Sequence, residues 1–243
     1  MRRTLKELTD VENPAWPEVV TWFDAATVSV QVIASDPVRS SAVLERLQVS
    51  LWSALGAQAF HTGGVFVDHK WIRLLGSGSP AIPLDIVTLT ERLGFWASID
   101  EPPTAVAFAV DAVGGIFAIN GGAFGGDGLG MVFYFSPDGL TWENLHLGHS
   151  AMIRHLLSGS MDQFYESLRW KGWEAEAERL NGDRAILVYP PLWSVECRPL
   201  ESAKRADVPL SEVIDMNLNV YAPAIASGDT QFTIKVRPLS PPP

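Results

Sequence analysis

The spacing of four apolar segments in the middle of the chain limits the fold more than any other feature. These segments cover residues 105–110, 116–120, 131–135 and 141–145. Two short turns and one glycine-rich loop connect them, whereas parallel strands need a crossover of a dozen or more residues, usually a helix. The sequence Ser136-Pro137-Asp138-Gly139 is typical of a tight turn. We therefore predict an antiparallel β-meander over about residues 104–146.

Helices are expected on both faces of this sheet, because the first and third segments are apolar on both sides. The pairs Asn13-Pro14 and Asp36-Pro37 each place an N-cap residue before a first-turn proline, so each predicts the start of a helix. Alternating valines between the two pairs, over residues 27–33, predict a strand. The fold class that follows is α+β, with an α-β-α element before the meander.

After the meander, the pattern predicts a helical segment over residues 149–171 and a further strand over residues 185–189. Ser160-Met-Asp-Gln163 has the spacing of a capping box inside the helical segment. We expect residues 1–195 to form a single α+β domain. Residues 196–243 are expected to be a weakly defined C-terminal extension that ends in a disordered proline tail.

The composition indicates a globular chain in a reducing compartment. Cys197 is the only cysteine, which excludes an internal disulfide and a multi-cysteine zinc cluster. Hydrophobic residues make up 47% of the chain and charged residues 19%, enough for a packed core. Asp10, Glu12 and Asn13 fall where a signal peptide would be apolar. No window offers the roughly 20 uninterrupted apolar residues of a membrane helix. We predict a soluble, cytoplasmic protein without a membrane partner.

Acidic residues dominate the charge, with a formal net charge of −10 at pH 7. Between residues 74 and 153, Arg92 is the only basic residue against eight acidic ones. Such a surface repels phosphate backbones, so we do not expect nucleic acid as a direct ligand. The acidity fits either plain solubility or recognition of a basic protein.

The chain carries no recognisable catalytic motif. The glycine-rich residues 121–130 are not followed by the Gly-Lys-Ser/Thr of a phosphate-binding loop, and no Gly-x-Ser-x-Gly motif occurs. His61, Asp68 and His69 lie close together in sequence, but neighbouring residues of a strand point to opposite faces. A structural role is therefore favoured over a metal site. We predict no catalytic residue, no cofactor and no metal.

Three separated motifs resemble a known family. They are Thr62-Gly-Gly-Val-Phe-Val-Asp-His69 with Trp71-Ile-Arg-Leu-Leu-Gly-Ser-Gly78, Asp111-Ala-Val-Gly-Gly-Ile-Phe-Ala-Ile-Asn-Gly-Gly122, and Phe164-Tyr-Glu-Ser-Leu-Arg-Trp-Lys-Gly-Trp173. In this order they resemble the bacterial DUF2625 family, over most of residues 14–200. The meander followed by a helix is more loosely similar to the SUKH superfamily. That likeness implies an α+β fold whose bacterial members often act as immunity proteins that bind toxin domains. The family itself implies no catalytic residue.

Two sets of residues are candidates for a binding role. Asp127 and Asp138 lie in turns, where a scaffold presents side chains without disturbing the sheet. Trp170 and Trp173 end a predicted helix beside two basic residues, so we expect both to be partly exposed and to contact a partner. The second set is a candidate pocket. It consists of Gly63 and Gly64, whose pairing in a strand indicates a bulge or a close backbone approach, with Asp68 and Asp111.

These observations lead to three hypotheses. The first is a non-enzymatic protein-binding scaffold of SUKH-like type, with an immunity-like role, that binds a basic partner such as a toxin-like domain. The second is a small-molecule sensor or enzyme with a pocket near the glycine-rich segments. The third is a homo-oligomeric structural protein. The absence of a catalytic constellation and the acidic middle of the chain favour the first.

Overall fold

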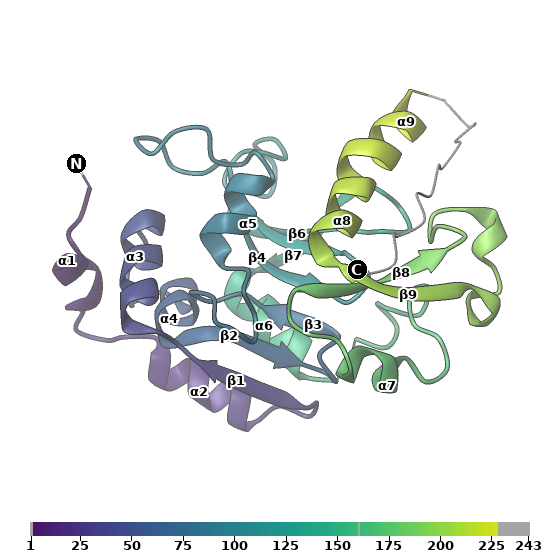
Figure 1. Ribbon diagram of the computed structural model, residues 1–243. Coiled ribbons are helices and arrows are strands. Elements are labelled where there is room, and N and C mark those ends of the chain that lie inside the picture. The colour runs from purple at the N-terminus through teal and green to yellow at the C-terminus, as the bar shows by residue number, and fades with distance from the viewer. Residues whose placement is uncertain (1, 160, 228–243) are drawn as a thin grey trace, which may run out of the picture.

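One antiparallel sheet dominates the computed structural model, which describes residues 2–159 and 161–227 (Figure 1). Its strands follow the order of the sequence, and each pairs with the next. They are β1 (Val30–Ala34), β2 (Thr62–Val67), β3 (Ile72–Leu74), β4 (Ala105–Asp111), β5 (Ile116–Asn120), β6 (Met131–Phe135) and β7 (Trp142–Gly148). The predicted meander is confirmed as β4 to β7. It is extended by three strands from the N-terminal half of the chain.

Helices cover both faces of the sheet, which confirms the α+β class. They are α1 (Leu5–Thr9), α2 (Trp16–Asp24), α3 (Pro37–Leu47), α4 (Ala54–His61), α5 (Ile86–Arg92), α6 (His149–Leu157), α7 (Trp173–Glu178), α8 (Leu210–Asp215) and α9 (Ala222–Ala226). Helix α4 packs on β2, α5 on β4, and α6 on β6 and β7. In Figure 1, α2 lies below β1, whereas α5 and α8 lie above the sheet. No helix of the described ranges is both long and apolar enough to span a membrane.

Residues 197–227 contribute to the same core. Strand β9 (Lys204–Pro209) pairs antiparallel with β8 (Arg184–Tyr189) and forms a second, two-stranded sheet. Short 3-10 helices, Val195–Cys197 and Leu200–Ser202, connect the two strands. A π-helical segment, η3 (Met216–Tyr221), continues α8. Leu200, Leu210 and Val213 are buried in the main core cluster. The predicted proline tail lies outside the described residues.

Two predicted elements differ from the structure. Residues 56–68, whose double glycine predicts a turn and a strand, begin inside helix α4 before strand β2, and Ser53 caps this helix by accepting a hydrogen bond from the backbone N–H of Gly56. After α6, the described residues 161–168 form turns rather than a second helix. Gly159 ends α6 with a left-handed φ of 72°. Of the four positions that the pattern places inward, Met161, Tyr165 and Leu168 are nevertheless buried and Phe164 is half-buried.

Candidate functional site

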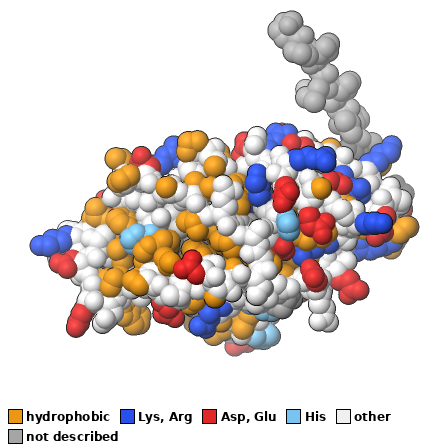
Figure 2. Space-filling model, turned by 90° about the horizontal axis from the view of Figure 1, so that it is seen from below, with side chains coloured by type: hydrophobic (Ala, Val, Ile, Leu, Met, Phe, Trp, Pro, Cys, Tyr) orange, Lys and Arg blue, Asp and Glu red, His pale blue; other side chains and the backbone are white. Residues whose placement is uncertain are grey.

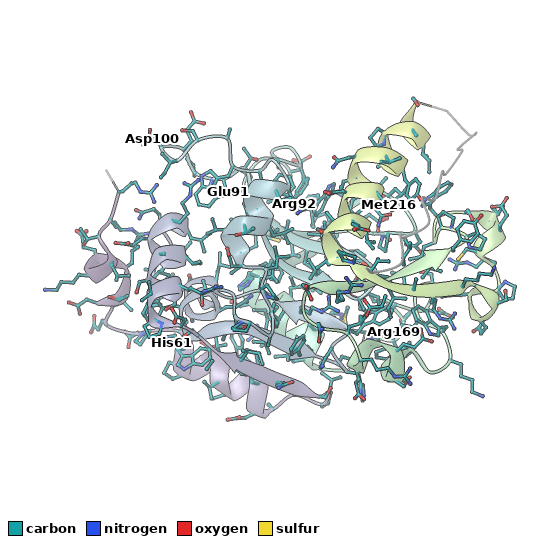
Figure 3. All side chains as sticks on the ribbon, in the orientation of Figure 1. His61, Glu91, Arg92, Asp100, Arg169 and Met216 are labelled. Atoms are coloured by element: carbon teal, nitrogen blue, oxygen red, sulfur yellow. The ribbon has the colours of Figure 1, made fainter. Side chains whose placement is uncertain are left out.

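The three sequence motifs meet in one place, which we call the motif cluster. It consists of Asp68, Trp71, Asp111, Tyr165 and Arg169. The rings of Trp71 and Tyr165 pack edge to face with centroids 5.6 Å apart. The guanidinium of Arg169 lies 4.7 Å from the Tyr165 ring centroid and 5.1 Å from that of Trp71. Its Nη2 atom donates to Asp68 at 2.5 Å, and Figure 3 shows Arg169 close to α7. Asp111 joins them through Tyr134, whose hydroxyl donates to its carboxylate and whose ring centroid lies 6.5 Å from that of Tyr165, so the three motifs share one packed region.

Asp111 organises the turn between β4 and β5. Its fully buried carboxylate accepts hydrogen bonds from the backbone N–H groups of Val113 (3.0 Å) and Gly115 (2.7 Å) and from the Tyr134 hydroxyl (2.7 Å). Burial raises the pKa of Asp111, while these three bonds act in the opposite direction. A Cβ atom on Gly115 would lie 2.1 Å from the same carboxylate. This geometry supports a folding role for Asp111 and its turn.

The turn between β2 and β3 has an unusual backbone. Asp68, His69 and Lys70 all have left-handed φ angles, between 52° and 64°. Such angles are unfavourable for residues other than glycine, and they persist only where neighbouring contacts hold them. Ser29 provides two of these contacts, because its backbone oxygen accepts from the Asp68 N–H (2.8 Å) and its hydroxyl from the His69 N–H (2.7 Å). Glu178 adds a third, 2.5 Å from His69 Nδ1. The turn is therefore fixed to the chain segment that leads into β1.

The candidate pocket at Gly63 and Gly64 is filled by protein. A Cβ atom on Gly63 would lie 2.7 Å from the Ala34 backbone oxygen, and one on Gly64 would lie 2.8 Å from Ile82 Cδ1. The predicted bulge is confirmed, since the pairing of β1 with β2 shifts register between Ile33 and Ala34. The two glycines therefore permit close packing of β2 against its neighbours.

The four candidate partner residues have different surroundings. Asp127 is exposed in the glycine-rich loop. Asp138 is half-buried and accepts from the Ser136 and Ser167 hydroxyls. The partial exposure expected of both tryptophans is found only for Trp173, which is half-buried and stacks 3.7 Å from the Arg169 guanidinium. Trp170 is buried.

The burial of Trp170 comes from residues that follow it in sequence. Its Nε1–H donates to Glu176 at 2.9 Å, and the Arg205 guanidinium lies 4.6 Å above its ring. Arg205 belongs to β9, so local sequence gives no sign of this cover. A direct contact between Trp170 and a partner would require these groups to move.

Burial shifts the pKa of three other titratable groups. Burial lowers the pKa of His149 to about 3 and raises that of the buried Cys197 thiol. His61 stacks on Trp16, with ring centroids 4.7 Å apart, and burial lowers its pKa. Across residues 2–159 and 161–227, no group of three or more His, Cys, Asp or Glu residues is placed to hold a metal ion.

The outer edge of β1 is a feature that the sequence interpretation missed. The backbone oxygen of Ser29 accepts a hydrogen bond from the Asp68 N–H and therefore faces β2. In an antiparallel strand, the backbone N–H and C=O groups of successive residues point to alternate sides, so those of Val30 and Val32 point away from β2. Among the described residues, no strand pairs with this outer side. Residues 25–35 contain no charged side chain, and the Val32 side chain is 42% exposed. The uncharged run is visible in the sequence, but its place at the edge of a sheet is not.

The surface around β1 is rich in apolar side chains. Figure 2 views the molecule from below, on the side where α2 and β1 lie in Figure 1. Hydrophobic side chains gather over the left and centre of this view, whereas charged side chains are more frequent on the right. Trp16 and Trp22 of α2 are both only partly buried. The edge of β1 thus lies on a side of the molecule with much apolar surface.

Comparison with known proteins places the chain in a family. The model of the family described as "Protein of unknown function DUF2625" matches residues 5–213. The chain belongs to this family. It is similar to the uncharacterized protein YbfG of Escherichia coli (strain K12), with 36% identity over 214 residues that cover 88% of this chain and 95% of the relative. An uncharacterized protein of Haemophilus influenzae is 33% identical over 190 residues, which cover 78% of this chain and 82% of the relative. The family has no described function, and the SUKH likeness stays a prediction.

Proposed function

We propose that the chain is a non-enzymatic protein-binding scaffold that adds an extended segment of a basic partner protein to β1. One observation carries the proposal: the outward backbone groups of Val30 and Val32 have no strand beside them among the described residues, on an edge without charge. Natural proteins usually protect such an edge with lysine, proline or a covering element. An unprotected edge is a template for strand addition.

Strand addition divides affinity and specificity between two kinds of contact. The backbone N–H and C=O groups of Val30 and Val32 would pair with the partner segment and supply affinity. The exposed Val32 side chain and the apolar surface of α2 would select apolar side chains at alternate positions of that segment. The partner is therefore expected to present an extended, alternately apolar segment.

The charges at the ends of β1 favour a basic partner. Asp24 and Asp36 bound the uncharged run, and both are exposed. In an antiparallel pair of two β1 strands, Asp24 of one copy would approach Asp36 of the other, and like charges brought together weaken association. Lysine or arginine at the ends of a partner segment would instead be attracted, in keeping with the net charge of −10. A toxin-like domain is a partner of this kind.

The packing of the motif cluster supports a function without catalysis. Asp111 accepts three hydrogen bonds, the Arg169 guanidinium stacks on Trp173 although its Nε atom has no partner among the described residues, and Gly63 packs against protein. A sensor or enzyme pocket at those residues would require an opening in this packing. The edge of β1 requires none.

Cross-linking from the edge tests the proposal. A photoreactive amino acid is placed at the exposed position 34 in β1 and, as a control, at the exposed position 171 just before α7. In cells that express the chain naturally, we expect a basic protein to be captured from position 34 and not from position 171. Capture of a second copy of the chain, or equal capture from both positions, contradicts the proposal.

Two substitutions at one residue sharpen this test. Val32→Pro removes an outward N–H and leaves the pairing of β1 with β2 intact, so capture from position 34 should be lost at an unchanged melting temperature. Val32→Ala keeps the N–H and should retain most of the capture. As a separate check, Gln31→Pro removes an N–H that faces β2 and should lower stability. Undiminished capture by Val32→Pro would mean that β1 is not the docking strand.

A further inference from the structure

A cavity of about 180 Å³ lies between β8, the β4–β5 turn and the α8–η3 helical run. Figure 3 marks Met216, which is on this run, above the β8–β9 hairpin. Apolar side chains form most of its wall, including Val113, Leu192, Val213 and Met216. Asn217 and Tyr221 add the polar groups of the helical side. No residue that lines the cavity carries a formal charge at neutral pH.

Asn217 is the decisive residue of this cavity. It is only 7% exposed, and its side-chain amide makes no hydrogen bond to the described residues. The amide atoms are not fully enclosed, so they can hydrogen-bond to water or to a molecule in the cavity. In a cavity wall, the same amide can both donate to and accept from a bound molecule.

The backbone at Asn217 also departs from regular helix. The N–H of Ala222 donates to the Asn217 backbone oxygen five residues earlier, which is the pattern of a π-helix. Single π turns are rare and occur frequently at functional sites, where they redirect a side chain. Two independent observations, the unpartnered amide and the π turn, thus coincide at one wall of the cavity.

We propose that this cavity binds a small uncharged molecule with an apolar ring or short chain and one hydrogen-bonding group that meets Asn217. The cavity volume limits the size of the bound molecule, since an apolar cavity of about 150 Å³ accepts benzene. The uncharged wall favours a neutral molecule, because an ion would lose its water without gaining a counter-charge. Asn217 and Tyr221 lie beyond the residues 5–213 that the family model matches. The cavity shares no residue with the motif cluster, but its wall meets the turn that Asp111 organises, because the Val113 N–H donates to Asp111.

Three aromatic compounds of nearly equal size test each part of this proposal. Benzamide has the ring and a neutral amide, toluene lacks the polar group, and benzoate carries a charge. We expect benzamide to bind with a dissociation constant of roughly 0.1–10 mM, as compounds this small do. Toluene should bind about three- to tenfold more weakly, in line with the loss of one hydrogen bond. Benzoate should not bind. Chemical shifts of the Ile186, Leu192 and Val213 methyl groups locate the site, with Leu8 and Leu44 as remote controls.

Two variants separate the cavity from the amide. Asn217→Leu should abolish the preference for benzamide over toluene while both still bind. Met216→Trp should fill the cavity from its half-buried rim and abolish binding of both compounds. The proposal is overturned if benzamide shifts no cavity methyl group at 20-fold excess over roughly 1 mM protein. It is equally overturned if benzamide and toluene bind equally to the unmodified chain, or if the shifts appear at Leu8 and Leu44.

Discussion

Asp111 and Arg73 are both fully buried charged residues, yet the protein surrounds them differently. They lie on the adjacent strands β4 and β3, where the pairing of Ile72 with Asp111 and of Arg73 with Val110 turns them to opposite faces of the sheet. Asp111 accepts three hydrogen bonds. Arg73 donates one, from Nη1 to the Arg184 backbone oxygen at 2.5 Å, and its Nε and Nη2 atoms have no partner among the described residues.

The difference shows that burial alone does not say what a charge does for the fold. The bonds of Asp111 join the β4–β5 turn to β6, so this carboxylate fixes a supersecondary unit. Arg73 reaches only one carbonyl of β8, and burial lowers its pKa to about 10 although Asp111, Asp183 and Asp207 act in the opposite direction. A buried charge is strongly stabilising only when its full set of partners is present. We therefore expect substitutions at the two sites to have very different effects.

The largest effect is expected from Asp111→Ala. It removes the acceptor of two backbone N–H groups and of the Tyr134 hydroxyl, and all three donors stay buried. We expect the free energy of unfolding to fall by about 3–5 kcal/mol, as measured by urea denaturation. Asp127→Ala, at an exposed loop position, is the control and should change it by less than about 0.5 kcal/mol. Similar losses for the two variants would contradict the role of Asp111.

Gly115→Val tests the same turn by adding a side chain where the backbone lies close to Asp111. Its Cβ atom would lie 2.1 Å from Asp111 Oδ2 and 2.3 Å from the Tyr134 hydroxyl oxygen, so the hydrogen-bonded group must separate. We expect the melting temperature to fall by roughly 5–10 °C. Gly126→Val is the matched control, because nothing lies within 4 Å of a Cβ atom there. An unchanged melting temperature in Gly115→Val would show that the turn tolerates a side chain.

The sequence predicts the parts of the fold that depend on local spacing. The meander, the turn after Asp111 and the helix after Asp36 all follow from residues close together in the chain, and all are present. Arg73 gives no such signal. In sequence it is the polar residue of a short apolar segment, the pattern of a solvent-facing position. It is buried because Arg184, 111 residues later, belongs to a hairpin that covers this face.

The candidate sites follow the same division. The motifs indicate Asp68, Asp111 and Trp173, but not that Arg169 and Tyr165 bring them together. The uncharged run of β1 is visible, but its exposure depends on the order of seven strands. The cavity at Asn217 needs residues from β8, the β4–β5 turn and η3. Local periodicity carries no information about contacts over such separations.

His149 is a second residue without its full set of partners; it is half-buried, and its effect on stability depends on pH. Its ring packs against Phe108 with centroids 4.7 Å apart, its Nε2 atom has no partner among the described residues, and burial lowers its pKa to about 3. The unfolded chain, with an ordinary pKa near 6.5, therefore binds a proton between about pH 6.5 and 3 that the folded chain does not. The stability contributed by the neutral imidazole is complete above pH 6.5 and decreases as the pH falls.

This dependence has a direct test. Between pH 7.5 and pH 5, His149 should account for a loss of about 2 kcal/mol in the free energy of unfolding. His149→Leu cannot be protonated and keeps an apolar contact with Phe108, so its loss over the same interval should be smaller by that amount. Urea denaturation at the two pH values measures both chains. Parallel pH dependences would mean that His149 is protonated without penalty in the folded state.

The smallest effect is expected from Arg73→Met, where two terms oppose each other. The substitution removes a charged hydrogen bond to the Arg184 carbonyl, which contributes about 1.5–3 kcal/mol. It also removes two buried donors without partners, each of which costs about 1–3 kcal/mol. Methionine fills most of the same space, so the free energy of unfolding should change by no more than about 1 kcal/mol. Arg73→Ala leaves a cavity in place of the side chain and should lose about 2–5 kcal/mol. If methionine is as damaging as alanine, the guanidinium at position 73 stabilises the fold as strongly as the carboxylate of Asp111, and the contrast between the two sites is wrong.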